Sequence, residues 1–165
     1  MGSNPRSGAP KLSQITLQRA TRRDLPEVAA LEQVCYGDPW PATAFAALPD
    51  NERVYFAIAR VDVRQRVAGY VVAWYVLDEG ELANLAVAPG DRGRGIGGAL
   101  LDAMLADAAS RGIVKVYLEV RESNVAARQL YAGREFEEVG RRKQYYRNPN
   151  EDALILRRSL GQTSA

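Results

Sequence analysis

Few groups in this chain can transfer protons, because its 165 residues contain no histidine and one cysteine, Cys35. Without histidine there is no Ser-His-Asp triad, no Cys-His pair and no imidazole ligand for a metal. One cysteine cannot form an internal disulfide or a thiolate zinc site. Carboxylates and phenols remain, so we expect acid–base chemistry by such groups and no metal.

A glycine- and arginine-rich loop gives the clearest signal of ligand binding. It lies between a mostly apolar stretch ending at Val87 and a run of apolar residues at helical spacing from Ile96 to Ala108. Glycines let backbone N–H groups approach a ligand, and a helix start offers N–H groups without helical acceptors at the positive end of its dipole. The loop therefore predicts a phosphate or pyrophosphate site formed by Arg92, Gly93, Arg94, Gly95, Ile96, Gly97 and Gly98.

Other interpretations compete for this loop. Gly93, Gly95 and Gly98 match the dinucleotide pattern G-x-G-x-x-G, and Glu119 follows at about the distance of a ribose-binding acid. A doubly wound sheet needs several further strand–helix units, however, and only about 45 residues follow Glu119. A Walker loop is excluded because no Gly-Lys-Ser/Thr ends the run. A glycine-rich turn without a ligand is the plain alternative.

The elements before the loop are expected to place its strand in a sheet. Alternation over residues 14–20 predicts an edge or half-buried strand. Thr21 then caps a helix, followed by a proline-containing break at 36–41 and a short helix carrying Phe45 and Leu48. The first helix should bury a stripe of Leu25, Val28, Leu31 and Val34. Three antiparallel strands are expected at 54–60, 67–77 and 81–87.

The elements after the loop complete the sheet. A helix from Ile96 to about Gly112 leads into a strand at 113–120, which such a crossover makes parallel to the strand at 81–87. A helix at 125–132 follows. The last elements are an antiparallel strand pair, 136–142 and 153–160, joined by a polar loop at 143–150. The order indicates one mixed-sheet α/β domain.

Composition is that of one ordinary domain. Hydrophobic residues make up 47% of the chain, and 22 Lys and Arg stand against 20 Asp and Glu, so no bulk nucleic-acid partner is indicated. We expect a disordered tail at 1–13, the domain at 14–160 and a short tail at 161–165. No signal peptide or membrane span is indicated, which favours a cytoplasmic protein without a membrane partner.

Two segments carry a family resemblance. The segment "LAVAPGDRGRGIGGALL" resembles the acetyl-CoA motif of the GCN5-related N-acetyltransferase (GNAT) family, Arg/Gln-x-x-Gly-x-Gly/Ala, through Arg92, Gly95 and Gly97. The segment "VYLEVRESNVAARQLY" is similar to the family's RimI-type branch, which acetylates the N-terminal alanine of a small-subunit ribosomal protein. "DPWP", "FEEVGRRKQYY" and "EDALIL" add to the likeness.

The resemblance implies a fold and a set of roles. The fold is a single α/β domain with a mixed, mostly antiparallel sheet, a βαβ cofactor-binding core and helices on both faces. Glu119 would accept a proton and Tyr131 would donate one. The cosubstrate acetyl-CoA would lie along the backbone of Leu85, Ala86 and Val87, with its pyrophosphate on residues 93–98 and a contact from Asn124. A protein N-terminus, from a ribosomal protein, would be the acceptor.

Each candidate also has a plainer interpretation. Glu119 can be a solvated glutamate at a strand end, and Tyr131 a buried aromatic between helix and sheet. Trp40 either packs on the core or walls a substrate site, and Cys35 is expected to be a packing residue. Arg141, Arg142, Lys143, Tyr145 and Tyr146 either form a solvated strand end or bind a peptide at the substrate mouth.

One position departs from the family, and two other functions compete. Glu135 stands where the family usually has the glycine that ends a helix in a left-handed turn, so we expect the turn after Tyr131 to differ. The competing functions are acetylation of a small amine or a lysine side chain, and a non-catalytic acyl-CoA sensor. A lysine amine has a pKa near 10.4, against about 8 for an α-amine, and demands a stronger base.

Overall fold

A seven-stranded sheet forms the centre of the computed structural model, which describes residues 14–161. The expected tail at 1–13 and residues 162–165 of the expected C-terminal tail lie outside the described residues. The strand order is β1-β2-β3-β4-β5-β7-β6, and among these neighbours β4 and β5 are the parallel pair. The strands are β1 Thr16–Arg19, β2 Val54–Val61, β3 Arg66–Val76, β4 Glu79–Val87, β5 Lys115–Arg121, β6 Glu137–Tyr146 and β7 Glu151–Ser159.

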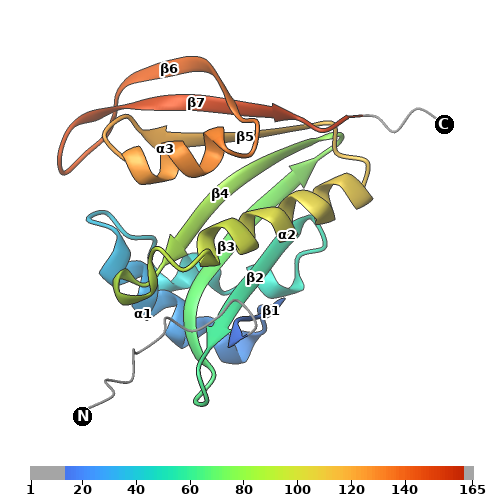
Figure 1. The fold of residues 1–165 in the computed structure, drawn as a ribbon, viewed down its shortest axis with the longest axis vertical. Coiled ribbons are helices and arrows are strands. Elements are labelled where there is room, and N and C mark those ends of the chain that lie inside the picture. Colours follow the sequence, from blue (N-terminus) through green and yellow to red (C-terminus); the bar gives the residue numbers. More distant parts are fainter. Residues whose placement is uncertain (1–13, 162–165) are drawn as a thin grey trace, which may run out of the picture.

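Helices cover both faces of this sheet, as expected. In Figure 1, α2 crosses one face with α3 beside it over β5, while α1 lies on the opposite face. The α-helices of the described residues are α1 Leu25–Cys35, α2 Ile96–Ser110 and α3 Val125–Ala132. Two short 3₁₀ turns, Ala42–Phe45 and Leu48–Asp50, replace the single short helix predicted after the proline-containing break. Two others are Arg22–Asp24, which Thr21 caps in place of α1 itself, and Pro89–Asp91 after β4.

Two hydrophobic cores result, one on each face. The core under α2 and α3 contains the fully buried Leu100, Leu101 and Met104. The core under α1 contains Phe45 and Tyr70. The strand β3 contributes to both cores and is buried on both faces, which confirms its predicted central place. Among the described residues, no helix has the length and apolarity to span a membrane.

Two further expectations about the elements are wrong. Val34 is 68% exposed, because the helical period runs from Val28 through Leu31 and Glu32 and turns Val34 to solvent. The polar loop at 143–150 shrinks to residues 147–150, since β6 extends to Tyr146 and β7 begins at Glu151. The pairing of β6 with β7 shifts its register between Arg142 and Tyr146, so the regular alternation that would predict a longer strand is interrupted there.

Candidate active site

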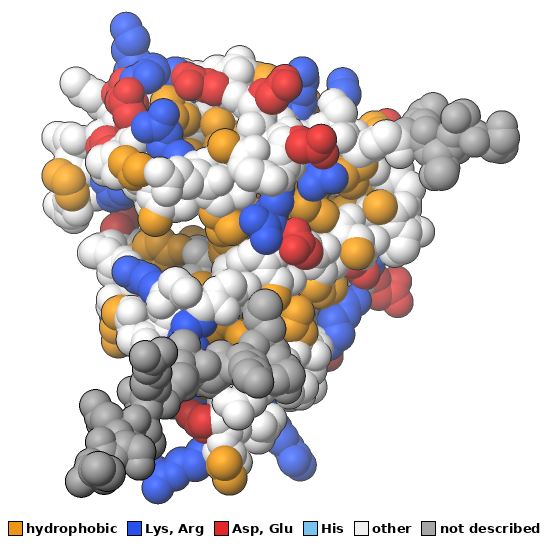
Figure 2. Space-filling view, viewed as in Figure 1, with side chains coloured by type: hydrophobic (Ala, Val, Ile, Leu, Met, Phe, Trp, Pro, Cys, Tyr) orange, Lys and Arg blue, Asp and Glu red, His pale blue; other side chains and the backbone are white. Residues whose placement is uncertain are grey.

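A gap between β4 and β5 forms the centre of the candidate site. The two strands pair over residues 79–82 and 115–118 and then diverge (Figure 1). At this point Val72 of β3 faces Asn84 while Ala73 faces Leu82, so Ala83 is an extra residue in β4. Such a bulge bends a strand and increases its twist. Figure 2 shows the surface hollowed between the β5–α3 part and the rest of the molecule, with hydrophobic side chains at the floor.

The second half of β4 turns backbone groups toward this gap. The N–H of Ala88 donates to Ala68 O of β3 at 2.8 Å, and successive residues of a strand point their polar groups to opposite sides. Leu85 and Val87 therefore face away from β3. Accordingly, the Leu85 carbonyl accepts from the Tyr36 hydroxyl at 2.5 Å, and the Val87 carbonyl accepts from Arg92 Nε at 3.1 Å.

The loop between β4 and α2 has the conformation that its glycines predict. Gly93 and Gly95 take φ angles of 77° and 80°, in the left-handed region that side chains disfavour. Gly95 is the N-cap of α2, so the N–H groups of the first helical turn follow it directly. A Cβ added at Gly97 would lie 3.5 Å from Leu130 and 3.6 Å from Val87, which places this turn at the gap between β4 and α3.

The arginine Arg94 is held by a buried carboxylate. Its Nη1 lies 2.6 Å from Asp91, and Arg66 of β3 bonds the same carboxylate at 2.7 Å. The hydrogen bond from Arg66 lowers the pKa of Asp91. Arg94 Nε is buried and lacks a hydrogen-bond partner among the described residues. A bound anion would satisfy this donor, so the loop fits the phosphate-binding role expected of it.

The last glycine of the loop faces the end of α3. A Cβ at Gly98 would overlap the Arg134 guanidinium, whose Nε bonds Asp102 of α2 at 2.8 Å. Gly98 therefore leaves room for the ion pair that joins α2 to the segment after α3.

Glu119 approaches the gap from the α1 face of the sheet. Its neighbours Leu118 and Val120 are buried in the core under α2 and α3, so alternation turns Glu119 to the other face. Its side chain is 21% exposed, and Oε1 lies 2.7 Å from Nε of Arg142 on β6. The charge of Glu119 is the main cause that raises the pKa of Tyr145.

Tyr131 lies on the opposite side, in the core under α2 and α3. It is 7% exposed, and its ring meets Phe136 edge-on at 5.7 Å between centroids. Burial raises the pKa of the Tyr131 hydroxyl, with a smaller effect from Tyr146, so this phenol stays protonated at neutral pH. Burial and then Glu119 raise the pKa of Tyr146 to about 12. Glu119 thus raises the pKa of both tyrosines, Tyr145 and Tyr146.

The two aromatic candidates of the β6–β7 hairpin, Tyr145 and Tyr146, lie close together at the end of β6. Tyr145 and Tyr146 meet edge-on at 5.2 Å, and the Arg142 and Arg121 guanidinium groups lie over their respective rings. Tyr145 is half exposed.

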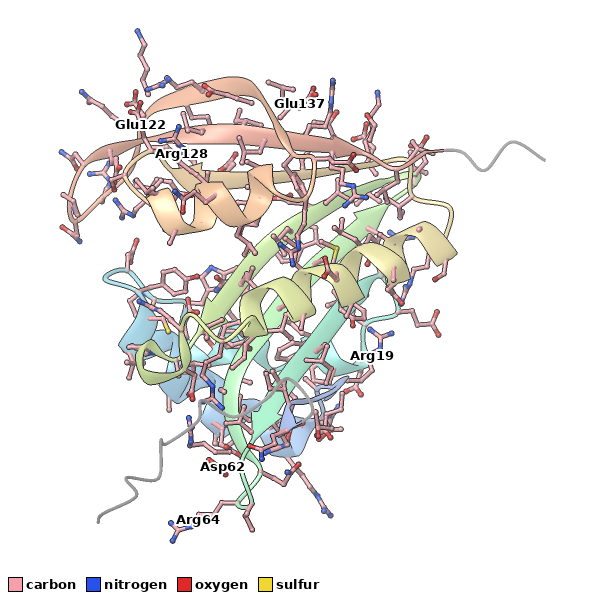
Figure 3. All side chains as sticks on the ribbon, viewed as in Figure 1. Arg19, Asp62, Arg64, Glu122, Arg128 and Glu137 are labelled. Carbon is pink, nitrogen blue, oxygen red and sulfur yellow. The ribbon has the colours of Figure 1, made fainter. Side chains whose placement is uncertain are left out.

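Asn124 and Glu135 lie at the two ends of α3. Asn124 caps the helix, its Oδ1 accepting from Ala127 N–H at 3.1 Å. In Figure 3, Glu122 and Arg128 lie near one another at this end of the helix, where Arg128 bonds the Glu122 carbonyl. At the other end Glu135 itself takes φ 66°, and Phe136 N–H bonds Tyr131 O at 3.1 Å. This is the left-handed ending that glycine provides elsewhere, so the expectation of a different turn is wrong.

Trp40 packs on the core, as its plainer interpretation predicted. Its ring is stacked on Trp74 at 6.1 Å and 8° and lies 5.4 Å from Phe45. Its backbone N–H donates to Glu32 Oε1 at 3.0 Å.

Two residues of the site were missed from the sequence. Glu32 is a buried carboxylate on α1, and its spacing of four from Val28 is the signal that would have placed it on the buried face. Tyr36 lies in the break after α1, and no local pattern marks it. Burial, followed by the nearby Tyr131 and Glu32, raises the pKa of its hydroxyl.

Comparison with known proteins defines the class. The acetyltransferase (GNAT) family model matches residues 25–136, more than half of the chain. The chain therefore belongs to the GNAT family, and it is an acyltransferase.

Within this family, the chain is similar over most of its length to enzymes named as alanine N-acetyltransferases or N-alpha-acetyltransferases. The [ribosomal protein bS18]-alanine N-acetyltransferase of Salmonella typhimurium is 34% identical over 143 residues, covering 86% of this chain and 95% of the relative. The N-alpha-acetyltransferase RimI of Mycobacterium tuberculosis is 37% identical over 163 residues, covering 91% and 96%. The crystal structure of the ribosomal-protein-S18-alanine N-acetyltransferase from Escherichia coli has a TM-score of 0.83 at 32% identity, covering 91% of this chain and 96% of that one.

Proposed function

We propose that this chain transfers the acetyl group of acetyl-CoA to the N-terminal α-amine of a protein, with alanine as the first residue and a small-subunit ribosomal protein as the substrate. The observation that carries the proposal is the gap between β4 and β5, with Glu119 on one face and Tyr131 on the other. The names of the relatives at 34% and 37% identity support the substrate.

The cosubstrate fits the residues that surround the gap. The pyrophosphate would lie on the N–H groups of residues 93–98, with Arg94 Nε as a further donor. The acyl arm would run beside Leu85, Ala86 and Val87, replacing the Tyr36 hydroxyl at the Leu85 carbonyl. Asn124 at the start of α3 would contact the arm through its amide nitrogen, since Oδ1 already caps the helix.

The chain's own groups would serve direct transfer. The amine nitrogen attacks the thioester carbonyl carbon, forming the C–N bond while the C–S bond breaks. Glu119, directly or through water, takes the proton that the amine loses, and Tyr131 gives its proton to the leaving thiolate. The Val87 N–H, which faces the gap, is placed to stabilise the negative charge that develops on the carbonyl oxygen.

The acceptor side would be the α1 face. Trp40, Tyr145 and Tyr146 would contact the peptide, and Arg142 beside Glu119 disfavours the protonated form of an entering amine. An α-amine with a pKa of about 8 is partly neutral already, so a single carboxylate suffices.

A thiol-release assay with two peptides tests the proposal. One peptide has a free N-terminal alanine and an arginine-rich continuation, and the other has the same sequence with a blocked N-terminus and an internal lysine. We expect turnover on the free N-terminus and loss of that turnover in Glu119→Gln. Turnover on the lysine peptide alone, or on neither peptide while acetyl-CoA still binds, would contradict the proposal and point to a lysine, small-amine or sensor function.

A further inference from the structure

A buried carboxylate lies behind the active site without any part in the proton transfers described above. Glu32 is 1% exposed, on the face of α1 that also buries Val28 and Leu31. Burial raises its pKa, which shows that this environment disfavours the charge. A polar side chain in such a place lowers stability unless donors surround it.

The Glu32 carboxylate is the acceptor in each of its hydrogen bonds. The Trp40 N–H donates to Oε1 at 3.0 Å, Asn84 Nδ2 donates to Oε2 at 2.8 Å, and the Tyr70 hydroxyl donates to Oε2. Asn84 Nδ2 also donates to the Tyr70 oxygen at 2.9 Å. This donor set suits an ionised carboxylate, which accepts only. The two oxygens serve different parts of the fold, the Trp40 segment on one side and the β3–β4 pair on the other.

The Oε2 side leads to the acyl-arm strand. Asn84 directly follows the bulge residue Ala83, and its Oδ1 accepts from the Leu85 N–H at 3.0 Å. Asn84 thereby satisfies a backbone N–H at the point where β4 has left β5. Glu32 orients this amide and, through it, the segment whose carbonyls face the gap.

The Oε1 side leads to the acceptor face. The Trp40 ring lies on Trp74, whose Nε1 donates to Glu81 at 3.0 Å, and both rings lie on the face of the sheet that carries α1. Glu119 points to the same face. The Trp40 backbone position is therefore set by Glu32 and its ring position by Trp74.

We propose that Glu32 is a positioning residue that couples the acceptor-binding Trp40 segment to the bulge of β4. Its carboxylate fixes the distance between the two sides, so that an acceptor amine held against Trp40 meets the acyl group at β4. The effect on the acceptor rests on the proposed function, whereas the effect on Trp40 does not.

The substitution Glu32→Gln should disturb the Trp40 segment and leave the contacts to β4 in place. The donors from Tyr70 and Asn84 hold the amide oxygen at the Oε2 position, which leaves the Nε2 group facing the Trp40 N–H. The Trp40 segment loses its anchor while β4 keeps its own. We expect the acceptor KM to rise about tenfold and the acetyl-CoA KM to stay within about twofold.

A second readout needs no substrate. The chain has two tryptophans, so Trp74→Phe leaves Trp40 as the only one. In this background we expect Glu32→Gln to increase acrylamide quenching of Trp40 fluorescence about twofold. Glu138→Gln, at an exposed position on β6, is the matched control and should change neither readout. Glu32→Asp is the second variant if Glu32→Gln does not fold. It keeps the charge but is too short to reach both sides, so the acceptor KM should again rise while the acetyl-CoA KM stays nearly unchanged.

The outcomes are distinct. A rise in both the acceptor KM and the quenching supports the coupling. Equal rises in the two KM values, an unchanged acceptor KM, or unchanged quenching overturns it and leaves Glu32 with a role in stability alone. If the unmodified enzyme turns over no N-terminal peptide, the proposed function fails, and the quenching result by itself decides whether Glu32 positions Trp40.

Discussion

The Nε atom of Arg142 lies 2.7 Å from Oε1 of Glu119, so the proposed base is in contact with a cation from the β6–β7 hairpin. The Arg142 side chain is 57% exposed, and solvent therefore screens much of this attraction. The pair still orients the carboxylate at the mouth of the gap. The Arg142 cation also disfavours the charged form of an amine entering beside it.

Replacing Glu119 by glutamine should lower the rate of acetyl transfer strongly and change the stability of the fold little. Because the pair is exposed on one side, we expect the free energy of unfolding to fall by less than about 1 kcal/mol. Loss of a general base lowers kcat by about 100-fold or more. Steady-state kinetics with a free N-terminal peptide, together with thermal denaturation, measure the two effects.

Glu122→Gln is the matched control for this variant. Glu122 also pairs with an arginine of β6, Arg141, at 2.9 Å, and both partners are partly exposed. We expect kcat to stay within about twofold. A kcat of Glu119→Gln that equals the control would remove Glu119 from the chemistry.

The raised pKa of Tyr131 predicts the alkaline side of the pH profile. Its hydroxyl keeps its proton beyond the ordinary value of about 10, because burial disfavours the phenolate. The kcat of the unmodified enzyme should therefore rise to a plateau as the acceptor amine loses its proton and show no fall below pH 10. Rates measured from pH 6 to 10 check this, and a falling limb centred near pH 8 or 9 would contradict it.

Tyr131→Phe tests the same group directly. The ring keeps its edge-on contact with Phe136, so the fold should be retained while kcat falls about 100-fold. Tyr55→Phe is the control, since burial also raises the pKa of this phenol but it lies on β2. Single-turnover thiol release measures the step, and equal rates for the two variants would argue against a proton donor at Tyr131.

Local patterns accounted for most of the fold. Strand alternation, helical spacing and glycine positions act over a few residues, so the order of elements and the parallel pair β4–β5 followed from them. The conformation of Gly93 and Gly95 was predictable for the same reason, because the need for positive φ is a property of single residues.

Partners that are distant in the sequence could not be predicted in this way. Arg94 was predicted as part of a phosphate site, but its pairing with Asp91, which Arg66 of β3 also bonds, was not. The sequence led to no prediction for Glu32, because its donors Tyr70 and Asn84 lie on β3 and β4. Such contacts depend on the register of the sheet, which no single segment determines.

The conformation of Glu135 predicts an easy gain in stability. Its φ of 66° costs an L-residue about 1 kcal/mol relative to glycine, and its carboxylate is 84% exposed with one loose contact to Arg158 at 3.6 Å. Glu135→Gly should therefore raise the free energy of unfolding by about 1 kcal/mol, measured by denaturant titration. Glu135→Ala keeps the Cβ and should give no gain. A gain in alanine equal to that in glycine would show that charge, not backbone strain, is relieved.

The buried Asp91 predicts an acid-dependent loss of stability and of cosubstrate binding. Its pKa is lowered in the folded state, so its contribution is present above the unfolded value of about 3.9 and is lost as the pH falls through the folded value. Asp91→Asn should cost about 2 kcal/mol at pH 7 and raise the acetyl-CoA KM, because Arg94 loses its anchor. The difference from the unmodified protein should shrink as the pH falls below about 3.9 toward the lowered folded pKa of Asp91, as urea titrations across pH will measure. Asp62→Asn removes the exposed partner of the same Arg66 and should cost less than about 0.5 kcal/mol at any pH. If the difference in stability between Asp91→Asn and the unmodified protein does not change as the pH falls below about 3.9, packing rather than the ion pair holds this loop, and the orientation of Arg94 has another cause.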